Sequence, residues 1–184
     1  MAKRRSRSAL RAKAEDWRSF TREFEAESDR AAAVLGAAWL DAKLEGLLEN
    51  FFVNDSKTVT PLFEPTGPLG TFAARSRLAY SLGLISRRSF DDLVLIRGIR
   101  NRFAHELHGV QFSDRDIVDA CERLQSPGVF SAEGVVALKG EPRIAYELAV
   151  GVLGVFIRDA QAAALAIRRQ VKEPEVSRGR RTRG

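Results

Sequence analysis

Residues 95–105 read LIRGIRNRFAH, a stretch that places cationic and polar side chains inside a segment whose apolar residues recur like those of a buried helix. Successive residues of an α-helix are about 100° apart around its axis, so residues three and four apart share a face. The apolar positions that share one face here are Phe90, Leu93, Ile96, Ile99, Phe103 and Leu107. The pattern predicts a helix with this face in the protein core.

Four polar residues line the edge of that face. Arg97, Asn101 and His105 follow one flank at intervals of four residues, and Arg100 falls at the margin of the apolar stripe. A half-buried arginine costs free energy unless a carboxylate, a carbonyl or an anion satisfies its guanidinium. Two interpretations stay open. Either Arg100 pairs with an acidic residue of a neighbouring helix, or the four residues converge on a bound phosphate or carboxylate, with His105 titrating near neutral pH.

Composition limits the kinds of protein this chain can be. Its 184 residues, 45% of them hydrophobic, suffice for one domain with a sizeable core. The single cysteine, Cys121, excludes an internal disulfide framework and a multi-cysteine zinc site, so we expect a cytoplasmic protein. His105 and His108 are the two histidines, and no metal-ligand spacing accompanies them. We therefore expect no metal and no other cofactor.

The two ends of the chain carry its net charge of +6. Residues 1–13 hold six basic residues and no acid, residues 171–184 hold five basic residues and two acids, and residues 14–170 have a net charge of −3. We expect two disordered basic tails around a single helical domain at 14–170. Such tails would bind nucleic acid by charge, without reading its sequence. The basic side chains of the N-terminal tail are Lys3, Arg4, Arg5, Arg7, Arg11 and Lys13.

Helical periodicity covers most of the domain and begins near Ala14, as one long helix or as two. Gly83 is expected to end a helix, and residues 54–70, with three prolines and two glycines, are expected to form an ordered loop. The residue types predict four helix starts, which are Ser28 with Asp29, Thr71, Ser86, and Ser113 with Asp116 in a capping box.

Residues 144–167 form the longest apolar segment, with small residues that permit close helix packing. Its charge-free stretch, residues 148–157, is too short to cross a bilayer, so we expect no membrane contact. Residues 129–139 are expected to form a small hairpin or flap. The predicted fold class is all-α, a multi-helix bundle with a long C-terminal apolar helix at its centre or in a dimer interface.

Asp41 and Glu45 lie one helical turn apart. Because the sequence supplies no metal ligands beside them, we expect them to face solvent or to pair with Arg75 or Arg100 rather than to act in catalysis. Arg75 and Arg77 are expected on a solvated helix face, with an anion-binding surface as the alternative. The side chains of the domain that would form such an anion-binding or nucleic-acid-binding surface are Arg75, Arg97, Arg100 and Arg102.

Four blocks of sequence follow one another in the order of a known family. They are ESDRAAAVLGAAWLDAKLEGLL (27–48), GPLGTFAARSRLAYSLGLIS (67–86), IRGIRNRFAH (96–105) and Pro142-Arg143. Together they resemble the MltR-like mannitol operon repressor family over most of residues 20–165. The resemblance implies an all-helical transcriptional regulator of a sugar-alcohol operon. The sequence has no short helix pair with a basic second helix and a tight glycine turn, so we expect no helix-turn-helix.

Arg100 and Asn101, followed by His105, also resemble the R-x4-6-H signature of HEPN domains, helical bundles that often dimerise and in several families cleave RNA without metal. The resemblance implies that Arg100 would hold the scissile phosphate and His105 would act as general acid or base. Asn101 would orient the RNA or the imidazole. A second subunit would complete such a site, which implies a homodimer.

The sequence thus predicts a cytoplasmic regulator of the mannitol-operon-repressor type, a homodimer that contacts nucleic acid through its tails and is not an enzyme. Two alternatives stay open. One is a metal-independent endoribonuclease with Arg100, Asn101 and His105 as its catalytic residues. The other is a helical adaptor that binds protein partners.

Overall fold

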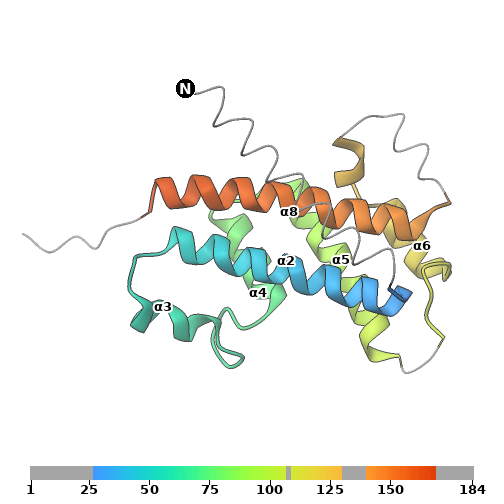
Figure 1. Ribbon diagram of the computed structural model, residues 1–184, viewed down its shortest axis with the longest axis horizontal. Helices are drawn as coiled ribbons and strands as arrows, with labels where there is room; N and C mark the ends of the chain where they lie inside the picture. The colour runs from blue at the N-terminus through green and yellow to red at the C-terminus, as the bar shows by residue number, and fades with distance from the viewer. Residues whose placement is uncertain (1–26, 107–108, 130–139, 169–184) are drawn as a thin grey trace, which may run out of the picture.

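The protein is described by a computed structural model that covers residues 27–106, 109–129 and 140–168. Within these ranges the fold is all-helical, as predicted, with six α-helices, one short 3-10 helix and no strand (Figure 1). The elements are α2 (Asp29–Phe51), α3 (Ser56–Phe63), α4 (Phe72–Ser81), α5 (Arg87–His105), α6 (Arg115–Glu122), η1 (Ser126–Val129) and α8 (Pro142–Ala166).

Several predictions concern residues outside these ranges. They are the helical pattern that begins near Ala14, the two basic tails with Lys3, Arg4, Arg5 and Arg7, residue His108, and all but the first residue of the 129–139 hairpin or flap. The limits of the helical domain at 14–170 lie outside them as well.

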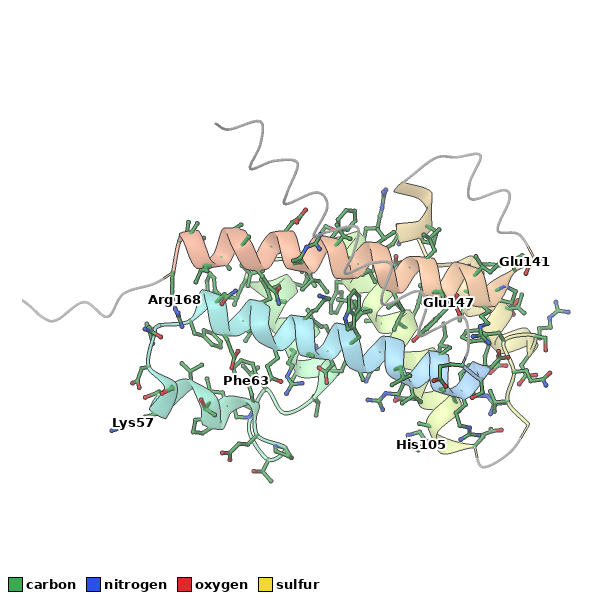
Figure 2. All side chains as sticks on the ribbon, viewed as in Figure 1. Lys57, Phe63, His105, Glu141, Glu147 and Arg168 are labelled. Carbon is green, nitrogen blue, oxygen red and sulfur yellow. The ribbon has the colours of Figure 1, made fainter. Side chains whose placement is uncertain are left out.

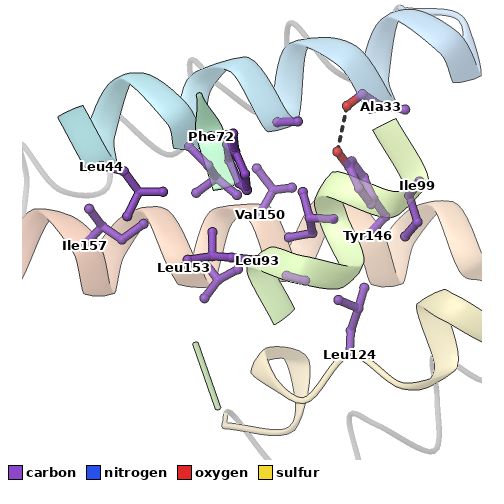
Figure 3. Packing of buried hydrophobic residues seen from close by; sticks show 14 of the residues in the cluster. Ala33, Leu44, Phe72, Leu93, Ile99, Leu124, Tyr146, Val150, Leu153 and Ile157 are labelled. Carbon is purple, nitrogen blue, oxygen red and sulfur yellow. Dashed lines mark hydrogen bonds between the residues drawn. The ribbon is translucent and has the colours of Figure 1, made fainter. Parts of the chain in front are cut away.

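The longest helices, α2 and α8, run side by side in the same direction (Figure 1). Near their N-terminal ends, the buried Tyr146 hydroxyl of α8 donates to the Ala33 carbonyl of α2 at 2.7 Å (Figure 3). Towards their C-terminal ends, Gln161 Nε2 donates to the Lys43 carbonyl at 2.7 Å. The predicted central position of the long apolar helix is therefore confirmed. Because the pair is parallel, the intervening helices must bring the chain back along its length.

The core lies between this pair and the shorter helices (Figure 3). The predicted core face of α5 is confirmed for Leu93, Ile96, Ile99 and Phe103, all of which are buried. Phe90, at the start of this face, is half-buried and stacks on Tyr80 of α4 with ring centroids 5.0 Å apart. Leu107 lies outside the described residues. Burial against the core raises the pKa of the Tyr146 hydroxyl.

By length and composition α8 is apolar enough to cross a membrane, but 44% of its most apolar window is buried inside the fold. A core helix of a folded domain meets the same criteria. Its contacts with α2 are those of such a core helix.

The side-chain caps predicted for three helices are confirmed. Ser28 accepts from the Ala31 amide at 3.3 Å, Thr71 from the Ala74 amide at 3.1 Å, and Ser86 from the Ser89 amide at 3.1 Å. Each cap satisfies one of the amides that a helix start leaves without a partner.

Gly83 ends α4 as predicted, with a φ of 71°. In this left-handed conformation its amide donates to the Tyr80 carbonyl at 2.9 Å, and the Leu84 amide donates to the Ala79 carbonyl at 2.9 Å. These two bonds form a Schellman motif, which satisfies carbonyls at the helix end.

Two local predictions were wrong. Residues 54–70 are not entirely a loop, because α3 forms within them. Asp55 caps this helix by accepting from the Lys57 amide at 3.2 Å, and more than one turn forms before Pro61. The second error concerns α6, which has Asp114 rather than Ser113 at its N-cap and has no side-chain cap bond. The Ser113 hydroxyl donates to Gln111 Oε1 at 3.3 Å instead.

The loop between α3 and α4 returns so closely to α3 that its glycines have no space for a side chain. A Cβ atom at Gly70 would lie 2.3 Å from the Glu64 carbonyl oxygen, and one at Gly67 would lie 2.4 Å from the Pro61 carbonyl oxygen. Both glycines belong to the GPLG sequence of the second family block. Their small size is therefore required by the fold.

We expect Gly70→Ala to lower the free energy of unfolding in urea by about 2 kcal/mol, because backbone must shift to admit the methyl group. Gly98→Ala in α5 is the matched control. A Cβ there would meet nothing within 4 Å, so this change should raise the free energy of unfolding by about 0.8 kcal/mol through helix propensity. Equal effects of the two substitutions would contradict the close approach of the loop.

Candidate functional site at the polar edge of α5

The polar residues of α5 lie along the helix as its sequence predicts. Arg97, Arg100 and Asn101 are half-buried, whereas His105 is exposed at the last position of the helix (Figure 2). Arg100 Nη1 donates to Asn101 Oδ1 at 3.0 Å. The predicted position of Arg100 at the core margin is therefore confirmed.

Arg100 has no carboxylate partner within the described residues, and the acidic pair expected as one alternative binds another arginine. Arg75 Nη1 lies 2.8 Å from Asp41 Oδ1, and Arg75 Nη2 lies 2.8 Å from Glu45 Oε2. The expected ion pair of Asp41 and Glu45 is confirmed with Arg75. One interpretation of Arg100 was an ion pair with an acidic residue of a neighbouring helix. The described residues contain no such ion pair.

The prediction that Arg75 lies on a solvated helix face was wrong, because its side chain is only 9% exposed. Besides the two carboxylates, Arg75 Nη2 donates to the Phe63 carbonyl at 3.2 Å. Helix α4 lies against α2, so Arg75 faces two acids that follow each other by one helical turn. With its terminal nitrogens occupied, Arg75 has little capacity to bind an outside anion.

Arg102 is also occupied within the chain. Its Nε lies 2.9 Å from Asp116 Oδ2 of α6, and its Nη1 contacts the Glu106 carboxylate. The hydrogen bond from Arg102 lowers the pKa of Glu106. Arg30 of α2 donates to the Glu106 carbonyl, so these contacts attach the end of α5 to both α2 and α6.

The arrangement that the HEPN signature implies is only partly present in one chain. Arg100 and His105 are five residues apart, which places them about 140° apart around the helix. No hydrogen bond joins His105 to Arg100 or Asn101 within the described residues. The catalytic roles of these three residues stay a prediction.

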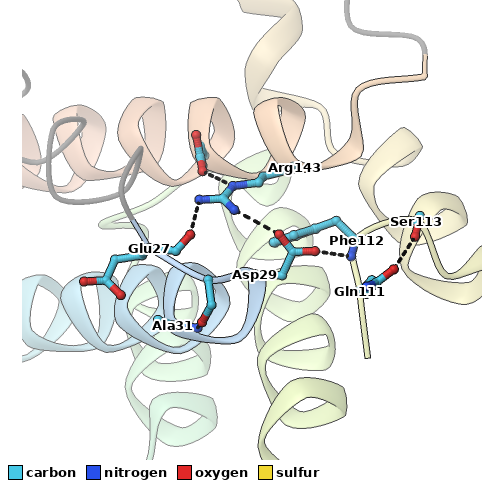
Figure 4. A network of polar contacts seen from close by, with 9 residues as sticks. Glu27, Asp29, Ala31, Gln111, Phe112, Ser113 and Arg143 are labelled. Carbon is cyan, nitrogen blue, oxygen red and sulfur yellow. Dashed lines mark hydrogen bonds and ion pairs between the residues drawn. The ribbon is translucent and has the colours of Figure 1, made fainter. Parts of the chain in front are cut away.

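The Pro142-Arg143 block has a structural role (Figure 4). Pro142 occupies the first turn of α8, where a missing amide hydrogen costs nothing. Arg143 Nη1 lies 2.9 Å from Asp29 Oδ1, and Arg143 Nε lies 2.8 Å from Glu147 Oε1. Asp29 Oδ2 also accepts from the Phe112 amide at 2.9 Å. Glu147 and then Asp29 raise the pKa of Arg143, and the network joins α2, α8 and the segment before α6.

Sequence reasoning missed Asp92, which is fully buried on the core side of α5. Its carboxylate accepts from the Gln125 amide at 2.9 Å, from the Ser126 amide at 2.6 Å and from the Ser126 hydroxyl. The sequence does contain a signal for this buried carboxylate, because Asp92 lies four residues before Ile96 and therefore on the apolar face of the helix. Cys121 of α6 is buried too, and burial raises the pKa of its thiol to about 12.

Comparisons with known proteins were made for the sequence and for the fold. A family model described as mannitol repressor, MtlR, matches residues 25–140. Mannitol operon repressors of Escherichia coli K12 and of Escherichia coli O6:H1 strain CFT073 are each 35% identical to this chain over 60 residues. Each alignment covers 33% of this chain and 31% of the relative, so it spans about a third of the curated proteins.

One solved structure has the same fold. It is a chain of the X-ray structure of the MtlR-HPr complex from Escherichia coli, with a TM-score of 0.60 and 22% sequence identity. The match covers 76% of this chain and 96% of that chain. At this identity the similarity concerns the arrangement of helices.

Proposed function

Because the chain belongs to the mannitol repressor family, whose model matches residues 25–140, we propose that it is a transcriptional regulator of the mannitol-operon-repressor type. It acts in the cytoplasm and through a protein partner rather than through a DNA-reading helix of its own. The observation that carries the proposal is the family match. It extends over more than half of the chain and includes the first three of the four blocks of sequence.

The charges of the short helices support regulation without a helix-turn-helix. A recognition helix must present basic or polar side chains to the major groove. In α4, Arg75 is buried and paired with acids of α2. In α6, the acids Asp116, Asp119 and Glu122 outnumber Arg115, so phosphates would repel this helix. Helix α6 therefore lacks the charge that groove entry requires, and α4 exposes one basic side chain, Arg77.

The partner that we propose is a protein of the HPr type, because the structure with the same fold is an MtlR-HPr complex. We expect the full-length chain to form a saturable complex with HPr of its own organism, measured by isothermal titration calorimetry at about 0.15 M salt. Protein–protein contact of a folded surface survives moderate salt, whereas tail electrostatics decline steeply. The complex should therefore persist at about 0.5 M salt. Absence of a complex when both proteins are at about 100 μM would contradict this partner.

Sequence-independent contact with DNA is proposed for the tails, and the protein is proposed to be a homodimer. Full-length protein should bind promoter DNA and shuffled DNA of equal length with the same affinity, and binding should weaken steeply with salt. A footprint on one promoter sequence at high salt would contradict the tail proposal.

Sedimentation equilibrium tests the proposed homodimer by measuring the mass of the protein in solution. A monomer across the micromolar range would contradict the homodimer.

A further inference from the structure

Two arginines of α5 differ from the other half-buried arginines of the described structure. Arg100 donates only to the carboxamide of Asn101, and Arg97 has no hydrogen bond or ion pair within the described residues. The remaining half-buried arginines each contact a carboxylate or a backbone carbonyl; they are Arg30, Arg102, Arg143, Arg158 and Arg168. The positive charges of Arg97 and Arg100 are thus not balanced by carboxylate contacts within the described residues.

This arrangement is unfavourable for the isolated protein. Arg97 and Arg100 are three residues apart, so they are neighbours on the helix surface and repel each other. Half-burial adds to the cost, because it removes part of the water around each guanidinium. A bound anion would offset both costs.

The geometry points to one anion between the two arginines. Around the helix axis Arg97 and Arg100 are about 60° apart, and Asn101 is about 40° beyond Arg97. Ala104, one turn beyond Arg100 and Asn101 on the same side of the helix, is exposed and has a small side chain. The Asn101 oxygen accepts from Arg100, and its amide nitrogen, which has no acceptor within the described residues, could donate to a ligand.

We propose that Arg97, Arg100 and Asn101 bind a phosphate group. Two guanidinium forks and a carboxamide supply donors from several directions, which suits a tetrahedral oxyanion better than a planar carboxylate. The phosphate belongs to a small phosphate ester or to the backbone of a single-stranded nucleic acid. The site consists of residues of α5 and does not depend on the proposed HPr partner.

The first experiment uses the unmodified full-length protein and inorganic phosphate as the probe, at constant ionic strength. The side-chain Nε–H signals of Arg97 and Arg100 in a nitrogen-15 NMR spectrum should shift and saturate with phosphate, while that of Arg88 stays unchanged. Shifts of all arginine signals in proportion, without saturation, would overturn the proposal. This measurement needs no variant and therefore does not depend on the folding of one.

The second experiment compares two double variants with equal changes of charge. R97Q/R100Q should weaken phosphate binding about tenfold, the loss expected when charge-assisted hydrogen bonds are removed. R88Q/R123Q changes two exposed arginines and should leave the affinity within about twofold of the unmodified protein. Equal losses of phosphate affinity in the two variants would mean that the net charge of the protein alone attracts phosphate, which would overturn the proposed site.

The two sources of phosphate are separated by titrating inorganic phosphate and a single-stranded RNA 12-mer in turn. If a small ester is the ligand, R97Q/R100Q loses affinity for phosphate and keeps its tail-dependent affinity for RNA. If the nucleic-acid backbone is the ligand, both affinities fall by a similar factor. HPr binding, measured in parallel, should be unchanged in R97Q/R100Q, so failure of this site and failure of the proposed partner are distinguishable.

Discussion

Arg75→Leu is expected to lower the free energy of unfolding by about 3 kcal/mol, because it leaves two carboxylates facing the core margin without their cation. The Arg75 side chain is 9% exposed, and Asp41 and Glu45 are 26% and 37% exposed, so water only partly replaces the lost contacts. The Phe63 carbonyl loses its hydrogen bond as well. In thermal unfolding followed by circular dichroism, a loss of this size lowers Tm by about 6–12 °C.

Arg77→Leu is the matched control, because Arg77 is an exposed arginine of the same helix. It should change the free energy of unfolding by no more than about 0.5 kcal/mol. Adding Asp41→Asn and Glu45→Gln to Arg75→Leu should restore part of the loss, since the uncompensated charges are then gone. Equal destabilisation by Arg75→Leu and Arg77→Leu would mean that the three-residue ion pair does not hold α4 to α2.

Much of the fold was predictable because it depends on local patterns. The apolar spacing of α5, the hydroxyl caps at Ser28, Thr71 and Ser86, and the left-handed glycine at Gly83 each act over a few residues. A pattern of that length is visible in the sequence. The family resemblance was likewise carried by short ordered blocks and is confirmed by the family match.

The errors concern contacts between distant segments or caps that compete with one another. Helix α3 was missed because the three prolines and two glycines of residues 54–70 indicated a loop, although Asp55 caps a helix there and Pro61 follows more than one completed turn. Asp114 replaced Ser113 at the start of α6, and Asp116 of the expected capping box pairs with Arg102. Whether an acid caps its own helix or pairs with another one depends on packing that a local pattern does not contain.

The candidate site was predictable in position and only partly in character. The sequence placed Arg97, Arg100 and Asn101 beside the apolar stripe, and they lie there. The sequence grouped Arg75 and Arg102 with Arg97 and Arg100 as possible anion-binding side chains. Tertiary contacts give Arg75 and Arg102 acidic partners. The difference between paired and unpaired arginines appears only when α2, α4 and α6 are packed around α5. That difference separates the arginines that hold helices together from the two arginines for which we propose phosphate binding.

Asp92→Ala is expected to lower the free energy of unfolding by about 3 kcal/mol. The substitution leaves the buried Ser126 amide and hydroxyl and the Gln125 amide without their acceptor, and a buried unsatisfied group costs about 1–3 kcal/mol. Part of this cost is offset because the carboxylate itself no longer has to be buried. Urea unfolding followed by circular dichroism measures the change.

The neighbouring Asp91→Ala is the matched control, because the ion pair of Asp91 within the described residues is with the exposed Arg87 one turn away, at 2.9 Å. It should cost no more than about 0.5 kcal/mol. Hydrogen exchange separates a local effect from a global one: in Asp92→Ala, exchange of the Gln125 and Ser126 amides should accelerate more than that of α2 amides. A uniform acceleration, or equal costs for Asp91→Ala and Asp92→Ala, would mean that the carboxylate does not hold η1 against α5. Asp92 would then be a buried carboxylate that the fold tolerates, rather than the acceptor that holds Gln125 and Ser126 at the start of η1.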